Sequence, residues 1–223
     1  MKKLWVFGDS FSSIFGIEDD INLEYIKKYP NYDSSIPPAA WYDHLSKKLN
    51  CTLERFSFPG GSNDLIISTI LENLQYISKD DIIIVGWTRP TRFSIPVRST
   101  NNGFFVSIAN RGASELVDST YHLNGSLNSY FDDIYLPNMD YYVSTKINTI
   151  IHFSNYLKNN FNFKSWNWWD IPHQSIRDEF PNQHDNHPSL KGHYQIFEEI
   201  DRMEYGTTSK WDLYHIDYTK NLD

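Results

Sequence analysis

The sequence of 223 residues has little cysteine, no long apolar stretch and an excess of acidic over basic residues. Cys51 is the only cysteine, so no intramolecular disulfide can form and the fold must depend on its core. Twenty lysines and arginines stand against 28 aspartates and glutamates, a net charge of −8. A phosphate backbone would on average be repelled by this charge, and we therefore expect no nucleic-acid partner.

The longest nearly unbroken apolar run covers only residues 82–87, far fewer than the roughly 20 that a membrane-spanning helix needs. No membrane association is therefore expected. Near the N-terminus, two lysines are followed by four apolar residues, 4–7, which is too short for the apolar core of a signal peptide. We therefore expect a cytoplasmic protein, and the single cysteine agrees with a reducing compartment.

Aromatic residues are abundant, with 14 Phe, 7 Trp and 15 Tyr, which make up 16% of the chain. So many dispersed aromatics are untypical of a disordered protein and indicate a packed core. The length suits one large α/β domain, and neither an internal repeat nor a low-complexity linker interrupts it. We predict a single domain over residues 1–223.

Apolar runs and helical periodicities alternate along the chain. Strands are predicted at 4–7, 53–58, 82–85 and 163–169, and helices at 38–49, 63–77, 139–161 and 190–203. This alternation predicts a mostly parallel sheet in a three-layer α/β/α arrangement. The stretch 88–138 shows a short possible strand at 104–108 and no clear helix, and we interpret it as an irregular insertion at the edge of the sheet. Ligands of such sheets collect at the carboxyl ends of the strands.

A serine follows the first predicted strand in the turn Gly8-Asp9-Ser10. A serine between a strand and a helix presents its hydroxyl to solvent and its N–H near the positive end of the helix. As a weak nucleophile it needs a base, for which His187, in the loop before the last helix, is the candidate. Asp185 could fix the tautomer of that imidazole, and Gly60 leaves a backbone N–H open to an oxyanion.

Three segments then carry a resemblance to a known family. They are Gly8-Asp9-Ser10-Phe11-Ser12, Gly60-Gly61-Ser62-Asn63, and residues 185–193, which read DNHPSLKGH. Together they resemble the SGNH hydrolase (GDSL esterase/lipase) family. The resemblance implies a flavodoxin-like α/β/α fold and metal-free, cofactor-free hydrolysis of carboxylic esters, such as acetyl groups on sugars. It also implies that Ser10 is the nucleophile, His187 the general base, and the N–H groups of Ser10 and Gly60 oxyanion donors. The expected partner is a small-molecule or carbohydrate ester.

Two positions depart from the family pattern. The family has Gly-x-Asn-Asp after the third strand, whereas this chain has Gly86-Trp87-Thr88-Arg89. The missing amide donor could be replaced by the hydroxyl of Thr88 or by the side chain of Asn63, although Asn63 could equally cap a helix. The family also spaces its acid and base as Asp-x-x-His. Asp185 is one residue closer, so either this loop differs or a backbone carbonyl orients the histidine.

Two further side chains are candidates for contact with a substrate: Trp87 by stacking on a sugar or acyl group, and Arg89 by pairing with an acidic group. Two other functions stay open. One is a binding module with this fold and weakened catalysis, which recognises a glycan or a protein. The other is metal-dependent hydrolysis, although the spacing of its candidate ligands matches no usual zinc signature. Those ligands are His173, His184, Asp185, His187 and His193.

Overall fold

The computed structural model describes residues 2–12, 39–58, 61–97, 104–108, 129–168, 170–175, 178 and 187–211. Its centre is a parallel sheet of four strands in the order β2-β1-β3-β6. The strands are β1 (Lys3–Gly8), β2 (Thr52–Ser57), β3 (Ile82–Trp87) and β6 (Asn162–Asn167). Counted along the chain within this sheet, the order is 2-1-3-4, which begins the flavodoxin-like order. The predicted α/β class with a parallel sheet is confirmed.

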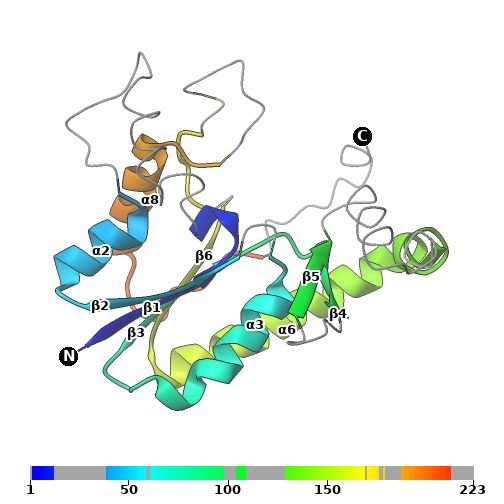
Figure 1. The fold of residues 1–223 in the computed structure, drawn as a ribbon, viewed down its shortest axis with the longest axis horizontal. Coiled ribbons are helices and arrows are strands. Elements are labelled where there is room, and N and C mark those ends of the chain that lie inside the picture. The colour runs from blue at the N-terminus through cyan, green and yellow to red at the C-terminus, as the bar shows by residue number, and fades with distance from the viewer. Residues whose placement is uncertain are drawn as a thin grey trace.

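Helices cover both faces of the sheet (Figure 1). Helices α2 (Trp41–Leu49) and α8 (Leu190–Arg202) pack on one face, and α3 (Asn63–Asn73) and α6 (Met139–Asn160) on the other. A 3-10 turn, η2 (Leu74–Tyr76), follows α3, so the helix predicted over 63–77 is an α-helix with a tighter end. All four helices predicted from periodicity are present, and the three-layer arrangement is confirmed.

The sheet separates two apolar cores, and successive residues of a strand contribute to opposite ones. In β1, Leu4 and Val6 pack under α2 and α8, whereas Trp5 and Phe7 pack under α3 and α6. Every residue of β3 is buried, as expected of a central strand covered on both faces. Five of the seven tryptophans belong to these cores: Trp5, Trp41, Trp87, Trp166 and Trp211.

The stretch predicted as an insertion contains a small antiparallel sheet of its own. Its strands are β4 (Phe93–Val97) and β5 (Phe104–Ile108), the second of which matches the strand predicted there. A π-helix, η3 (Tyr130–Tyr135), and a 3-10 turn, η4 (Leu136–Asn138), then lead into α6. The Tyr135 hydroxyl donates to the carbonyl of Thr91 at 2.5 Å, and its ring lies 4.9 Å from that of Phe93. These contacts join the end of the insertion to its beginning, the loop that follows β3.

The segment after α8 lies along the outer edge of β6. The N–H of Gly206 donates to the carbonyl of Phe163 at 2.7 Å, and the N–H of Ser165 donates to the carbonyl of Thr207 at 3.0 Å. Trp211 completes the segment by packing its largely buried ring into the core under α3 and α6. The segment therefore pairs backbone groups that an edge strand would otherwise expose.

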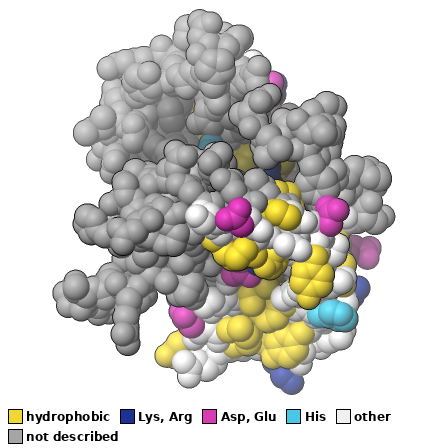
Figure 2. All heavy atoms as spheres, turned by 90° about the vertical axis from the view of Figure 1, so that its right-hand side faces the viewer, with side chains coloured by type: hydrophobic (Ala, Val, Ile, Leu, Met, Phe, Trp, Pro, Cys, Tyr) yellow, Lys and Arg dark blue, Asp and Glu magenta, His cyan; other side chains and the backbone are white. Residues whose placement is uncertain are grey.

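Figure 2 shows the side of the molecule where α6 begins, with hydrophobic side chains exposed among polar ones. On α6 the large exposed side chains are Tyr141, Ile151 and Tyr156. None of the described helices combines the length and the apolar character needed to cross a membrane.

Candidate active site

The turn after β1 carries Ser10 to the carboxyl end of the sheet. The 3-10 turn η1 (Ser10–Ser12) follows Asp9 directly, and the Asp9 carboxylate accepts the N–H of Phe11 at 3.0 Å. The carbonyl of Asp9 accepts the N–H of Ser12 at 3.0 Å. Both bonds hold the backbone of Ser10 in a fixed turn at the top of β1, while its side chain lies outside the described part of the structure.

Two glycines make room for this turn. A Cβ on Gly8 would lie 2.3 Å from Ser12 Oγ, and one on Gly86 would lie 2.4 Å from the same atom. Since β1 and β3 are neighbours, Ser12 fits between the ends of the two strands only because neither glycine has a side chain. This is the point at which the strand order changes direction, where sheets of this kind bind their ligands.

His187 lies beside this turn. Its ring centroid is 5.1 Å from that of Phe11, the residue next to Ser10. Phe11 also packs against the rings of Trp168 and His173, both at 5.8 Å. The two sequence motifs from opposite ends of the chain therefore meet through Phe11, at the edge of the sheet that the sequence predicts.

The loop before α8 is held by backbone contacts with residues 174 and 175. The N–H of Ser189 donates to the carbonyl of Gln174 at 3.0 Å, and Pro188 forms an isolated bridge with Ser175. At the start of α8, a Cβ on Gly192 would lie only 2.0 Å from the carbonyl oxygen of Gln174. The first turn of α8 can thus approach this segment closely, and the approach positions His187.

A buried ion pair joins the loops after β1 and β3. The Arg92 guanidinium Nη1 lies 3.0 Å from Oδ2 of Asp9, a residue with only 2% of its surface exposed. The same Nη1 donates to the hydroxyl of Thr88 at 2.8 Å. Burial raises the pKa of Asp9, and the opposing effects of Arg92, the hydrogen bond from Thr88, the N–H of Phe11 and nearby His187 do not cancel this.

The sequence does not predict this pair as part of the site. Arg92 is visible in the sequence beyond the third strand, and Asp9 beside the serine. The sequence pattern that could have predicted this ion pair is the occurrence of opposite charges after two strands, Asp9 after the first and Arg92 after the third.

Asn63 binds the backbone of Thr88. Its Oδ1 accepts the N–H of Thr88 and its Nδ2 donates to the carbonyl of Thr88, both at 2.9 Å. The side chain that caps α3 is that of Ser62, whose Oγ accepts the N–H of Leu65 at 3.4 Å. Asn63 therefore fixes the loop after β3 rather than capping the helix, and one N–H of its amide is not used in these two bonds.

Of the other candidate oxyanion donors, the structure describes the side chain of Thr88 but not Gly60. The Thr88 hydroxyl accepts from Arg92 and donates to Asp9, so its proton is already engaged. Gly60 and Asp185 lie outside the described residues, as does His184.

Trp87 and Arg89 have opposite environments. The ring of Trp87 is 1% exposed and lies in the core under α3 and α6. It therefore presents no face for stacking on a substrate, which corrects the expectation for this residue. Arg89 is exposed, and its guanidinium lies 5.0 Å from the ring of Trp168, which in turn stacks on Phe11. Arg89 thus lies on the aromatic group that contacts the Ser10 turn.

His193 is buried in α8, and its pKa is lowered to about 3 by burial and by the neighbouring His173, His44 and His187. Its imidazole is therefore neutral at physiological pH. Among the residues that the structure describes, no group of three or more His, Cys, Asp or Glu side chains could hold a metal ion.

Comparison with known proteins finds similarity to solved structures. No family model matches the sequence, and no curated protein matches it. A solved structure from Desulfitobacterium hafniense DCB-2, described as a "putative lipolytic protein of G-D-S-L family", is similar with a TM-score of 0.35 and 12% sequence identity. The match covers 91% of this chain and 99% of that one. A similarity at 12% sequence identity and a TM-score of 0.35 assigns no activity to this chain.

Proposed function

We propose that this protein is a serine hydrolase that cleaves carboxylic esters, with Ser10 as nucleophile. The observation that supports this best is the contact between His187 and Phe11, 5.1 Å between ring centroids, at the switch point of the sheet. It brings a candidate base from the end of the chain beside the turn that carries a candidate nucleophile. Nucleophilic catalysis by serine requires this pairing.

The proposed reaction has two halves. The Ser10 hydroxyl attacks the ester carbonyl while His187 takes its proton and returns it to the leaving alcohol. Water, activated by His187, then attacks the acyl-enzyme and releases the carboxylic acid. We assign to Asp185 the orientation of His187. Because His193 is neutral at physiological pH, its imidazole adds no positive charge beside His187.

The oxyanion of each tetrahedral intermediate needs hydrogen-bond donors. We assign this role to the N–H groups of Ser10 and Gly60 and to the remaining N–H of Asn63. Thr88 would have to give up its bond to Asp9 to donate through its hydroxyl, so we assign to it mainly the positioning of the loop after β3. Loss of one oxyanion donor typically costs about 10² to 10³ in rate.

The substrate is proposed to be a small-molecule or carbohydrate ester, including acetylated sugars. Arg89, exposed beside the Phe11 and Trp168 rings, is the candidate for pairing with an acidic group of such a substrate. This pairing would favour charged over neutral esters of the same acyl group.

The experiment that tests the proposal is labelling with a fluorophosphonate, read by intact mass and peptide mapping. We expect one adduct, on Ser10, which is lost in Ser10→Ala and strongly slowed in His187→Ala. Ser12→Ala is the matched control, because Ser12 lies in the same turn but its Oγ is buried. p-Nitrophenyl acetate hydrolysis should fall about a thousandfold or more in Ser10→Ala. An unlabelled wild-type protein, or an adduct that persists in Ser10→Ala, would contradict the proposal.

One observation favours a second candidate, a binding module without efficient catalysis. Thr88 and Asn63, which could replace the missing asparagine of the third motif, both use polar groups inside the protein. A protein of this kind would bind a glycan or a protein with an affinity that Ser10→Ala leaves unchanged. It would also leave the fluorophosphonate unreacted.

A further inference from the structure

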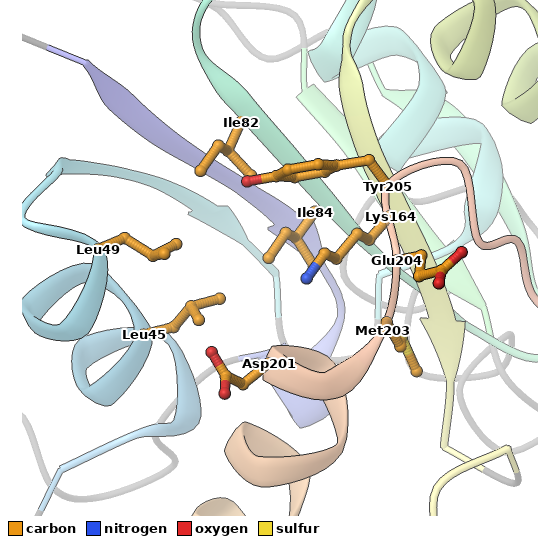
Figure 3. Close-up of a pocket in the computed structure, with 9 residues that line it drawn as sticks. All are labelled: Leu45, Leu49, Ile82, Ile84, Lys164, Asp201, Met203, Glu204 and Tyr205. Carbon is orange, nitrogen blue, oxygen red and sulfur yellow. The ribbon is translucent and has the colours of Figure 1, made fainter.

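A cavity lies toward the other end of the sheet, near the amino ends of β3 and β6. Its volume is about 430 Å³, within the range of small-molecule sites. The walls come from α2, β3, β6 and the end of α8 (Figure 3). The lining residues are apolar except for four, and comprise Leu45, Leu49, Ile82, Ile84, Met203, Lys164, Asp201, Glu204 and Tyr205.

Lys164 is the unusual residue of this cavity. It belongs to β6 and is only 8% exposed, and its Nζ donates to the carbonyl of Ile200 at 2.9 Å. The ammonium also lies 5.1 Å from the centre of the Tyr205 ring. Among the described residues no carboxylate lies within 4 Å of this ammonium, which has three donors and uses one of them.

The nearby carboxylates compensate this charge only in part. Asp201 forms its ion pair with Lys48, at 2.5 Å, and Glu204 is exposed. Figure 3 shows the Asp201 and Lys164 side chains directed into the same space, with Glu204 turned away from them. The one carboxylate directed toward Lys164 is therefore already paired with Lys48, a half-exposed residue that does not line the cavity. Burial lowers the pKa of Lys164. The negative charge of Asp201 offsets this only in part, and the nearby Lys48 lowers the pKa further, as expected for an ammonium short of negative partners.

We propose that this cavity binds a small monocarboxylate with an apolar chain. The carboxylate would accept hydrogen bonds from the free donors of Lys164, and the chain would lie against Leu45, Ile84 and Met203. A neutral ligand would leave the ammonium without a counter-charge, and a cation would be repelled by it. The site is separate from the Ser10 turn, and the inference does not depend on the proposed hydrolase activity.

The test is isothermal titration calorimetry of the full chain at pH 7 with octanoate, octanamide and octylamine. Because a charge-assisted hydrogen bond in a buried site is a strong one, we expect octanoate to bind at least about tenfold more tightly than octanamide. Octylamine should show no binding. Lys164→Met should weaken octanoate to the level of octanamide, whereas Lys79→Met, a matched exchange at an exposed turn, should leave its affinity unchanged.

A second variant keeps the lysine and fills the cavity. Met203→Trp should weaken octanoate at least about tenfold while the protein keeps its circular dichroism spectrum and its melting temperature. The proposal is overturned if octanoate and octanamide bind equally or if octanoate does not bind. It is also overturned if Lys164→Met and Lys79→Met behave alike. If Lys164→Met does not fold, Met203→Trp and the comparison of octanoate with octanamide decide the question.

Discussion

Removing the guanidinium of Arg92 should destabilise the protein in a manner that depends on pH. In Arg92→Met the Asp9 carboxylate stays buried and keeps the N–H of Phe11 and the hydroxyl of Thr88, but it loses its only ion-pair partner among the described residues. Leaving one partner of a buried pair uncompensated costs about 3–5 kcal/mol. Because 18% of the Arg92 side chain is exposed, we expect the lower end, about 3 kcal/mol at pH 7.

The sign of the pH dependence follows from the protonation of Asp9. The pKa of Asp9 is already raised above its ordinary value of 3.8 by burial, and loss of Arg92 raises it further. Between 3.8 and this higher pKa, the folded variant binds a proton that the unfolded chain does not. The stability of Arg92→Met should therefore fall as the pH rises through this window and recover as the pH is lowered through it.

Urea unfolding at pH 7 and pH 5 measures this effect on wild type, Arg92→Met, Asp9→Asn and the double variant. We expect the double variant to regain most of the loss, since the introduced asparagine is neutral and can still hydrogen-bond Phe11 and Thr88. The loss at pH 7 corresponds to a fall in melting temperature of about 6–12 °C for a protein of this size. Arg202→Met, which breaks an exposed pair with Glu199, is the control and should cost about 1 kcal/mol or less. If the single and double variants lose equal stability at both pH values, the uncompensated charge is not the cause.

Three further predictions concern the same end of the molecule. Asn63→Ala should lower the free energy of unfolding, measured by urea titration, by about 2–5 kcal/mol, because it leaves the buried N–H and carbonyl of Thr88 without partners. A loss below about 1 kcal/mol would contradict this. Gly192→Ala should cost about 1–3 kcal/mol and reduce esterase activity, because its Cβ would meet the carbonyl of Gln174 at 2.0 Å; an unchanged melting temperature would exclude this clash. The pKa of His193 is lowered from 6.5 to about 3. Between pH 6.5 and pH 3 the unfolded chain therefore binds a proton at His193 that the folded protein does not. The free energy of unfolding should fall by up to about 5 kcal/mol as the pH drops through this range. His193→Gln should flatten this part of the curve of unfolding free energy against pH, and a curve with the wild-type slope would show that another group is responsible.

The main sheet and its helices could be predicted because their side chains follow simple periods. Residues 82–85 are apolar and β-branched throughout, which only a strand buried on both faces requires. The segment at 206–211 could not be found in this way. Two of its contacts with β6 join backbone N–H and carbonyl groups, and Ser209 adds hydrogen bonds to the Ser165 hydroxyl; none of these contacts imposes a periodic pattern on the side chains.

In the site, too, the residues that follow a local sequence pattern could be predicted, whereas those brought together by the order of the strands could not. Ser10 and His187 follow from their places at the carboxyl end of a strand and before the last helix. The pairing of Asp9 with Arg92 depends instead on the order β2-β1-β3-β6, because only this order makes the loops after β1 and β3 neighbours. The burial of Trp87 could be predicted from the alternation of side chains along β3, because this alternation places Trp87 on the same face of the sheet as Ile83 and Val85.

The segment along β6 has a consequence for protein synthesis. All four strands of the main sheet have been translated by residue 167, but among the residues that the structure describes, the contacts along the outer edge of β6 come from the segment 206–211. At about 5–20 residues per second, a nascent chain carries an uncovered sheet edge for several seconds while the segment up to the end of α8 is translated. A slow codon or a stall within α8 would prolong this interval, and would thereby increase the chance that two nascent chains on one messenger pair through their β6 edges.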